Sequence, residues 1–333
     1  SNRRRLATKR RGSLCLEIYA KRRKRGAFGR KKELSLEPLV VTQDTFGAWE
    51  SWEEAPEFTL HSFVETINGG QAFRWKQIAS FYEGRWGSNV VRLRYSNGGI
   101  EYSLPVDSEP IDSLKNLRSY FACGTDFSAL TNSLPWRSDP ILATAIENFT
   151  GLRILRQPFA ETLLCFLCSS TKQIPQIKAI CEALAQDLGN PLADGSYALP
   201  NWDSIGRAGE QRLRSAKLGY RARYIYQTAL FLAERPGWLE ETEAAPTIEA
   251  RTRLMELPGV GRKIADCTLL FGAGRLEAFP IDTWVEKILT CAYQLEGLKQ
   301  PQLQDFARVH FGAAAGYAQQ YLFAAARAGH IPS

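Results

Sequence analysis

The pattern of hydrophobic and polar positions changes once along the chain, from alternation with period two to a helical period. Short alternating segments predict β-strands at Phe73–Trp75, Phe81–Trp86, Val90–Tyr95 and Ile100–Leu104. The tetrapeptide Ser96-Asn97-Gly98-Gly99 is typical of a tight hairpin turn. From Pro110 onward the apolar period predicts helices near 110–121, 138–149, 157–171, 174–187, 206–214, 221–234, 248–256, 262–272, 283–295, 301–310 and 316–328. Strands followed by many helices indicate an α+β fold with an antiparallel sheet.

Charge is distributed unevenly along the chain. Residues 1–32 hold fourteen Lys or Arg and one acidic residue, a net charge of +13, whereas the whole chain carries +7, so residues 33–333 carry −6. Such a basic segment is expected to be disordered and to bind polyanions non-specifically, and a purely solvated extension is equally compatible with its composition. We therefore expect a basic tail, a linker, an antiparallel sheet domain and a helical domain, at 1–34, 35–54, 55–147 and 148–330 respectively.

Neither a membrane span nor an export signal is expected, because no apolar run approaches the roughly eighteen residues of a spanning helix and no leader pattern opens the sequence. The expected location is intracellular, in the cytoplasm or nucleoid of a bacterium or the nucleus of a eukaryote. The seven cysteines are an odd number without disulfide spacing. Cys165 and Cys168 form a C-x-x-C inside an apolar run, which favours buried packing over zinc or redox chemistry.

The densest motif is Leu257-Pro258-Gly259-Val260-Gly261-Arg262-Lys263, which lies between two helical patterns and predicts a helix-hairpin-helix. Its glycines allow a tight turn, and free N–H groups of Gly259, Val260, Gly261 and the following helix suit a phosphate. Backbone carbonyls of Met255, Leu257 and Val260 are candidates for holding a monovalent cation. Alone, the hairpin indicates DNA binding more strongly than catalysis, since plain DNA-binding hairpins often place a lysine at this position.

A second polar residue changes that interpretation. Asp282 follows Phe279-Pro280-Ile281 at the start of another predicted helix, where a helix cap is the ordinary role of an aspartate. Lys263 and Asp282 together closely resemble the helix-hairpin-helix DNA glycosylases with a Gly/Pro-Asp loop. The resemblance implies that Lys263 attacks the anomeric carbon, that Asp282 stabilises the sugar cation, and that a Schiff base then leads to β-elimination. The attack needs a neutral amine, which the helix N-terminus, neighbouring Arg262 and desolvation would favour.

Motifs far from the hairpin resemble one branch, the eukaryotic-type 8-oxoguanine DNA glycosylase/AP lyases. They occur in family order between Glu57 and Ala328, at Gly70–Trp75, Asn148–Gln157, Cys168–Ser170, Gly219–Tyr224 and Gly316–Phe323. This resemblance implies a TBP-like amino-terminal sheet domain followed by the helical glycosylase domain. It implies no required cofactor, and the four-cysteine cluster of the iron–sulfur branches is absent. The expected partner is double-stranded DNA containing oxidised guanine, bound by a monomer without a membrane.

The same resemblance assigns roles in the base pocket and at the site of extrusion. The carbonyl of Gly70 would accept N7–H, a donor that guanine lacks, and unpaired buried acceptors discriminate strongly. Cys267 and Phe323 would contact the two faces of the base, and Gln319 its Watson–Crick edge. The residues expected at the vacated position in the duplex are Tyr220 as a wedge, with Arg221 and Thr171 at the orphaned cytosine.

Departures from the family pattern leave other possibilities open. Thr171-Lys172-Gln173 and Gln176 replace the family's asparagine run and arginine, so we expect a weaker preference for cytosine opposite the lesion. Trp284 and Ala326 replace a phosphate-contacting histidine and its partner aspartate. Formamidopyrimidine is a further candidate substrate. The alternatives are a glycosylase of this fold for alkylated bases and a damaged-DNA-binding module without catalysis.

Overall fold

The computed structural model describes residues 45–333. The expected basic tail and the first part of the expected linker therefore lie outside the described residues. Within the described part, a five-stranded antiparallel sheet precedes a long series of helices, which confirms the predicted α+β class. No helix among these residues is long and apolar enough to cross a bilayer.

The sheet has the strand order β1-β5-β4-β3-β2 and is antiparallel throughout. Its strands are β1 (Glu50–Ser51), β2 (Trp75–Ile78), β3 (Phe81–Trp86), β4 (Asn89–Ser96) and β5 (Gly99–Ser103). The predicted hairpin is confirmed: Ser96 pairs with Gly99, and Asn97 and Gly98 take positive φ angles of 51° and 83°. The predicted strand at Phe73–Trp75 is shifted, since pairing with β3 begins at Trp75.

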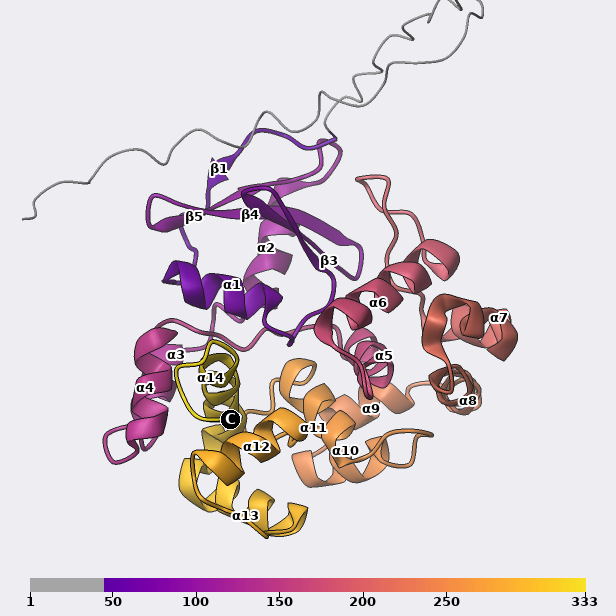
Figure 1. The fold of residues 1–333 in the computed structure, drawn as a ribbon. Coiled ribbons are helices and arrows are strands. Elements are labelled where there is room, and N and C mark those ends of the chain that lie inside the picture. Colours follow the sequence, from indigo (N-terminus) through magenta and orange to yellow (C-terminus); the bar gives the residue numbers. More distant parts are fainter. Residues whose placement is uncertain (1–44) are drawn as a thin grey trace, which may run out of the picture. The chain divides into compact units, whose positions relative to one another are not determined.

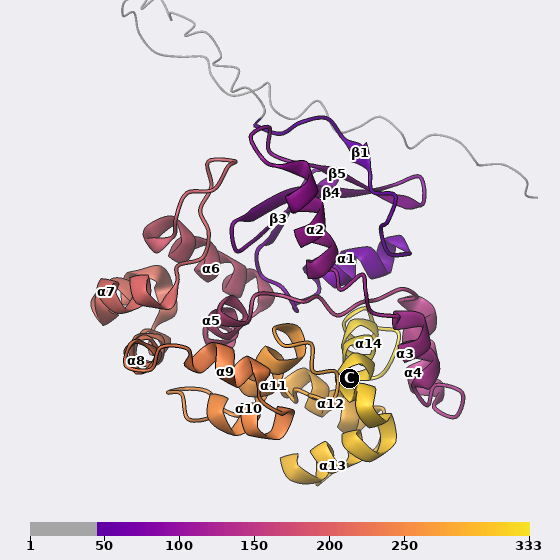
Figure 2. The ribbon, with the colours of Figure 1, turned by 180° about the vertical axis from the view of Figure 1, so that it is seen from behind.

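Helices α1 (Leu60–Asn68) and α2 (Pro110–Tyr120) pack against the sheet, as Figures 1 and 2 show. Their buried side chains share one hydrophobic core with Trp75, Leu93 and other strand residues. Part of the expected linker also belongs here, because Phe46 and Trp52 are buried and β1 pairs with β5. The linker expectation is therefore wrong for residues 45–54, because β1 extends the sheet and Trp52 belongs to the sheet core.

A second hydrophobic core is formed by the helices that follow. They are α3 (Phe127–Ser133), α4 (Pro140–Asn148), α5 (Phe159–Ser169), α6 (Ile174–Leu188), α7 (Trp202–Leu213), α8 (Arg221–Ala233), α9 (Trp238–Ala244), α10 (Thr247–Leu254), α11 (Arg262–Phe271), α12 (Thr283–Cys291), α13 (Gln300–Phe311) and α14 (Ala315–Arg327), with a π-helix at Arg214–Leu218 and a 3-10 turn at Gly312–Ala314. Helices α3 and α4 pack in this second core. The helical core therefore begins earlier in the chain than the expected domain boundary at 147/148.

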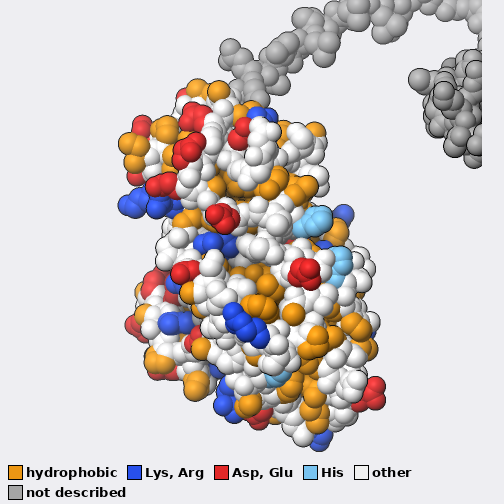
Figure 3. Space-filling view, turned by 90° about the vertical axis from the view of Figure 1, so that its left-hand side faces the viewer, with side chains coloured by type: hydrophobic (Ala, Val, Ile, Leu, Met, Phe, Trp, Pro, Cys, Tyr) orange, Lys and Arg blue, Asp and Glu red, His pale blue; other side chains and the backbone are white. Residues whose placement is uncertain are grey.

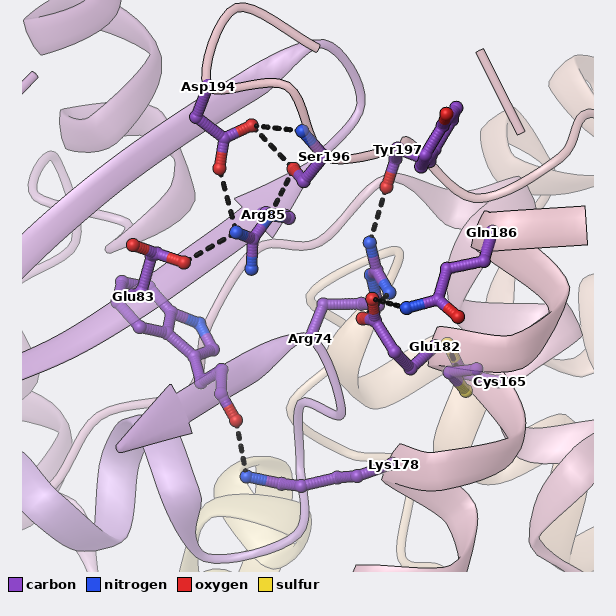
Figure 4. Close-up of polar contacts among 12 residues, drawn as sticks. Arg74, Glu83, Arg85, Cys165, Lys178, Glu182, Gln186, Asp194, Ser196 and Tyr197 are labelled. Carbon is purple, nitrogen blue, oxygen red and sulfur yellow. Dashed lines mark hydrogen bonds and ion pairs between the residues drawn. The ribbon is translucent and has the colours of Figure 1, made fainter. Parts of the chain in front are cut away.

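Polar contacts join the two parts along β2 and β3 (Figure 4). Arg85 on β3 donates to Asp194 at 2.7 Å and to Ser196 at 2.5 Å, both in the loop after α6. Arg74 donates to Glu182 on α6 at 2.6 Å and to the carbonyl of Tyr197 at 2.5 Å. These contacts fix the β2–β3 side of the sheet against α6 and the loop that follows it.

Candidate active site

The hairpin predicted from sequence lies between α10 and α11, and its geometry is that of a tight turn with free backbone donors. Gly259 has a φ of +79°, and an added Cβ would lie 2.7 Å from the Tyr224 ring, so no other residue fits. Val260 N–H bonds to the Leu257 carbonyl at 3.1 Å. Within the described residues no hydrogen bond uses the N–H groups of Gly259 or Gly261, which leaves them for an anion.

A buried carboxylate joins the two helices of this motif. Asp266 on α11 has no exposed surface and accepts from Arg251 on α10 at 2.6 Å, while Arg262 lies 3.6 Å from its other oxygen. Burial raises the pKa of Asp266, and the two arginines oppose this effect. The ion pair therefore fixes the angle at which the hairpin meets α11, one turn from Lys263.

Lys263 lies in the first turn of α11, as the motif predicts. Its Nζ donates to Ser169 Oγ at 3.3 Å and lies 5.1 Å from the centre of the Phe166 ring. Because the Ser169 hydroxyl donates to the Phe166 carbonyl at 2.7 Å, its lone pairs face the amine. Two residues of α5 thus hold the amine in place.

Asp282 caps α12 and borders the same cavity. One carboxylate oxygen accepts from the backbone N–H groups of Trp284 at 3.0 Å and Val285 at 2.9 Å. The capping role anticipated from sequence is therefore confirmed. Because the capping carboxylate also lines the cavity, the cap is compatible with a chemical role for Asp282. Burial raises the pKa of the Cys267 thiol to about 12, with Lys263 opposing and Asp282 reinforcing the shift, so the thiol is neutral and all three groups interact.

These groups meet in a cavity of about 710 Å³ between α5, α6, α11, α12 and α14. Of the predicted site residues, its lining includes Gly70, Thr171, Lys263, Cys267, Asp282, Gln319 and Phe323. Gly70 has a φ of +109°, and an added Cβ would lie 2.8 Å from Ile174 and 3.9 Å from Phe323. The Gly70 backbone thus forms one wall of a narrow slot opposite an aromatic ring.

Tyr220 and Arg221 lie outside this cavity lining and differ in exposure. Tyr220 is 51% exposed, as a wedge requires, but Arg221 is only 3% exposed. The Arg221 guanidinium lies 4.5 Å from the centre of the Tyr220 ring and donates to the carbonyls of Leu218 and Ser170 and to the Thr171 hydroxyl. Arg221 therefore supports the wedge and the loop after α5, and the structure does not present it at the surface.

Sequence reasoning missed several residues of the cavity. Ser169 lies in a recognised motif, but only the fold shows it beside Lys263. Arg327 on α14 donates to the carbonyl of Gly69 at 2.7 Å and to Glu65 at 3.0 Å, so it connects both walls of the slot. No sequence signal marks that contact. Gln320 gave a weak signal as the polar neighbour of Gln319.

A lysine and an aspartate at one cavity beside a hairpin, on a sheet-plus-helix scaffold, define a helix-hairpin-helix DNA glycosylase. Residues 56–163 match the family model described as 8-oxoguanine DNA glycosylase, N-terminal domain. The N-glycosylase/DNA lyase OGG1 of Arabidopsis thaliana is 32% identical over 277 residues, covering 78% of this chain and 76% of that protein.

Solved structures agree with this match. The structure of MBOgg1 with a low-affinity DNA ligand is 32% identical with a TM-score of 0.76, covering 86% of this chain and 96% of the other. The Clostridium acetobutylicum 8-oxoguanine glycosylase/lyase, bound to double-stranded DNA with cytosine opposite 8-oxoG, is 27% identical with a TM-score of 0.76, covering 86% and 100%. The chain belongs to the 8-oxoguanine DNA glycosylase/lyase family.

Proposed function

We propose that this protein removes 8-oxoguanine, and formamidopyrimidine with it, from duplex DNA and then cleaves the strand at the resulting abasic site. The observation that carries the proposal is the convergence of Lys263, Asp282 and Gln319 on one cavity. The cavity volume of about 710 Å³ is ample for an extruded nucleoside. Because DNA repair acts on the chromosome, we also propose an intracellular location at the nucleoid or in the nucleus.

In the proposed mechanism the neutral amine of Lys263 attacks C1′ of the extruded nucleotide. The bond from C1′ to the base breaks, its electron pair leaves with the base, and the base takes up a proton. The Asp282 carboxylate, fixed by two backbone N–H groups, stabilises the positive charge that develops on the sugar. Ring opening gives an imine on Lys263, and loss of a proton from C2′ then expels the 3′ phosphate by β-elimination.

Discrimination is proposed to depend on the walls of the slot. The Gly70 carbonyl would accept N7–H of the oxidised base, and Cys267, Phe323 and Gln319 would contact its faces and Watson–Crick edge. Support comes from Gln319, whose Oε1 is buried without a partner among the described residues. A binding site with unpaired buried polar atoms rejects bases that cannot pair with them.

DNA is proposed to bind at the hairpin Gly259–Gly261 through the N–H groups of Gly259 and Gly261. The N–H of Val260, expected from sequence to be a third donor, is already paired with the Leu257 carbonyl. We further propose that a monovalent cation on the carbonyl oxygens of Met255, Leu257 and Val260 bridges the hairpin to a phosphate, since hard cations prefer oxygen ligands. Such donors matter because the described residues 45–333 hold 28 Lys or Arg and 31 Asp or Glu, so their net charge of −3 does not by itself attract DNA. On the face drawn in Figure 3, acidic and basic side chains are interspersed and hydrophobic ones gather across its middle.

Trapping with borohydride tests the mechanism, because it reduces the imine to a stable protein–DNA adduct. We expect an adduct with 8-oxoguanine duplex that disappears in Lys263→Gln. Lys172→Gln is the matched control, since Lys172 lines the same cavity and should leave the adduct intact. An adduct only with alkylated bases would favour the glycosylase alternative, and no adduct with any lesion would favour the non-catalytic one.

A further inference from the structure

Two neighbouring glutamines in the cavity wall, Gln319 and Gln320 on α14, are buried without satisfying their amides. They are 5% and 2% exposed, and both line the active-site cavity. Among the described residues, Gln319 Oε1 and Gln320 Nε2 have no hydrogen-bond partner. Buried amide atoms are almost always paired, because they have given up their hydrogen bonds to water. Two such atoms in one cavity wall therefore need an explanation.

The rest of α14 does not share this defect. Tyr317 donates to the Leu152 carbonyl at 2.8 Å and lies 2.8 Å from the hydroxyl of Tyr321, so both phenols are paired. A comparable buried glutamine on α13, Gln304, donates to the Phe279 carbonyl at 2.9 Å. Unpaired amides on this helix thus coincide with the wall of the cavity, which is where a ligand would supply the missing partners.

We propose that Gln320 contacts the substrate, and that its amide donates to an acceptor oxygen of the extruded nucleoside. This inference rests on the proposed function, which, of the two glutamines, assigns a base contact only to Gln319. The two free atoms are complementary: Gln319 offers an acceptor and Gln320 a donor. Oxidised guanine carries both N–H donors and carbonyl oxygens, so it can satisfy the pair. The acceptor for Gln320 is a base carbonyl or a deoxyribose oxygen.

The test is Gln320→Met, which keeps the approximate shape and removes the amide. Single-turnover excision of 8-oxoguanine should fall about tenfold to hundredfold. The melting temperature should rise by about 2 °C, because an unpaired buried amide is lost. The matched control is Gln304→Met, which removes a paired amide and should lower the melting temperature. Gln320→Glu, which lacks the donor, should also excise slowly.

Cleavage of a preformed abasic duplex locates the acceptor. If excision falls but abasic cleavage falls far less, the acceptor is on the base; if both fall together, it is on the deoxyribose. Unchanged excision in Gln320→Met, or a melting temperature lowered as in Gln304→Met, would overturn the inference. Failure of the proposed function gives a different result, since the unmodified protein would then neither excise 8-oxoguanine nor form the trapped adduct.

Discussion

Glu161 makes stability depend on pH in a direction that the structure determines. It lies in the first turn of α5, and its carboxylate accepts the backbone N–H of Gly87, in the turn between β3 and β4, at 2.9 Å. Burial raises the pKa of Glu161 to about 7, while the Gly87 bond and Arg74 oppose the shift. The folded protein therefore holds this proton more tightly than the unfolded chain, in which a glutamate has a pKa of about 4.3.

The sign and size of the pH effect on the free energy of unfolding follow from this difference in pKa. Below about pH 4 both states are protonated, and the group contributes its full stability. As pH rises from there to about 7, the unfolded state loses the proton first, so stability falls. The total loss is at most about 4 kcal/mol at pH 8, and solvent screening of the partly exposed carboxylate reduces it toward about 1 kcal/mol.

Glu161→Gln tests this reasoning, because glutamine keeps an oxygen for Gly87 N–H but cannot ionise. Urea unfolding should show the variant gaining on the unmodified protein by about 1 to 3 kcal/mol between pH 5 and pH 8. Glu240→Gln, at an exposed position on α9, is the control and should show no such gain. A stability difference for Glu161→Gln that is the same at both pH values would refute the argument.

Further predictions concern the site itself. Ser169→Ala should slow single-turnover base excision about tenfold with little change in DNA affinity, because it frees the Lys263 amine; an unchanged rate contradicts that role. Asp266→Asn should destabilise the protein by about 3 kcal/mol in urea unfolding and weaken DNA binding, since it leaves Arg251 unpaired; equal stability would refute this. Arg327→Met should slow excision more than abasic cleavage, with Arg137→Met as control because that exposed arginine also lies over an aromatic ring.

The periodicity of apolar residues predicted those helices and strands whose buried positions are determined by the local sequence. The hairpin at Ser96–Gly99 and helix α11 were predicted because turn residues and apolar spacing coincide. Helix α1 was missed because Val64, Thr66 and Ile67 are β-branched and Thr59 pairs with Ser62, not with the usual Glu or Gln, in its capping box. Its helical state depends on Phe63 and Ile67 packing under the sheet, which is tertiary information.

The candidate catalytic residues could be predicted where a short sequence motif determines the local backbone geometry around them. Lys263 and Asp282 could be found because each stands at the start of a helix, next to a turn of recognisable composition. The contacts that hold them could not, since Ser169 is distant in sequence and reaches Lys263 only through the packing of α5 against α11. Their roles in catalysis remain predictions until trapping is done.

Arg221 illustrates why a residue's role does not follow from its motif. The motif places it at the orphaned base, yet its guanidinium is committed to the carbonyls of Leu218 and Ser170 and to Thr171, whose φ is +53°. A side chain so engaged shapes the loop after α5, and pulling it toward DNA would break several hydrogen bonds to a charged group. Contacts to the opposite base would then fall to the exposed residues of that loop, beginning with Thr171 itself. Because a threonine hydroxyl both donates and accepts, it pairs with more than one base, which gives the expected weak preference for cytosine a structural cause.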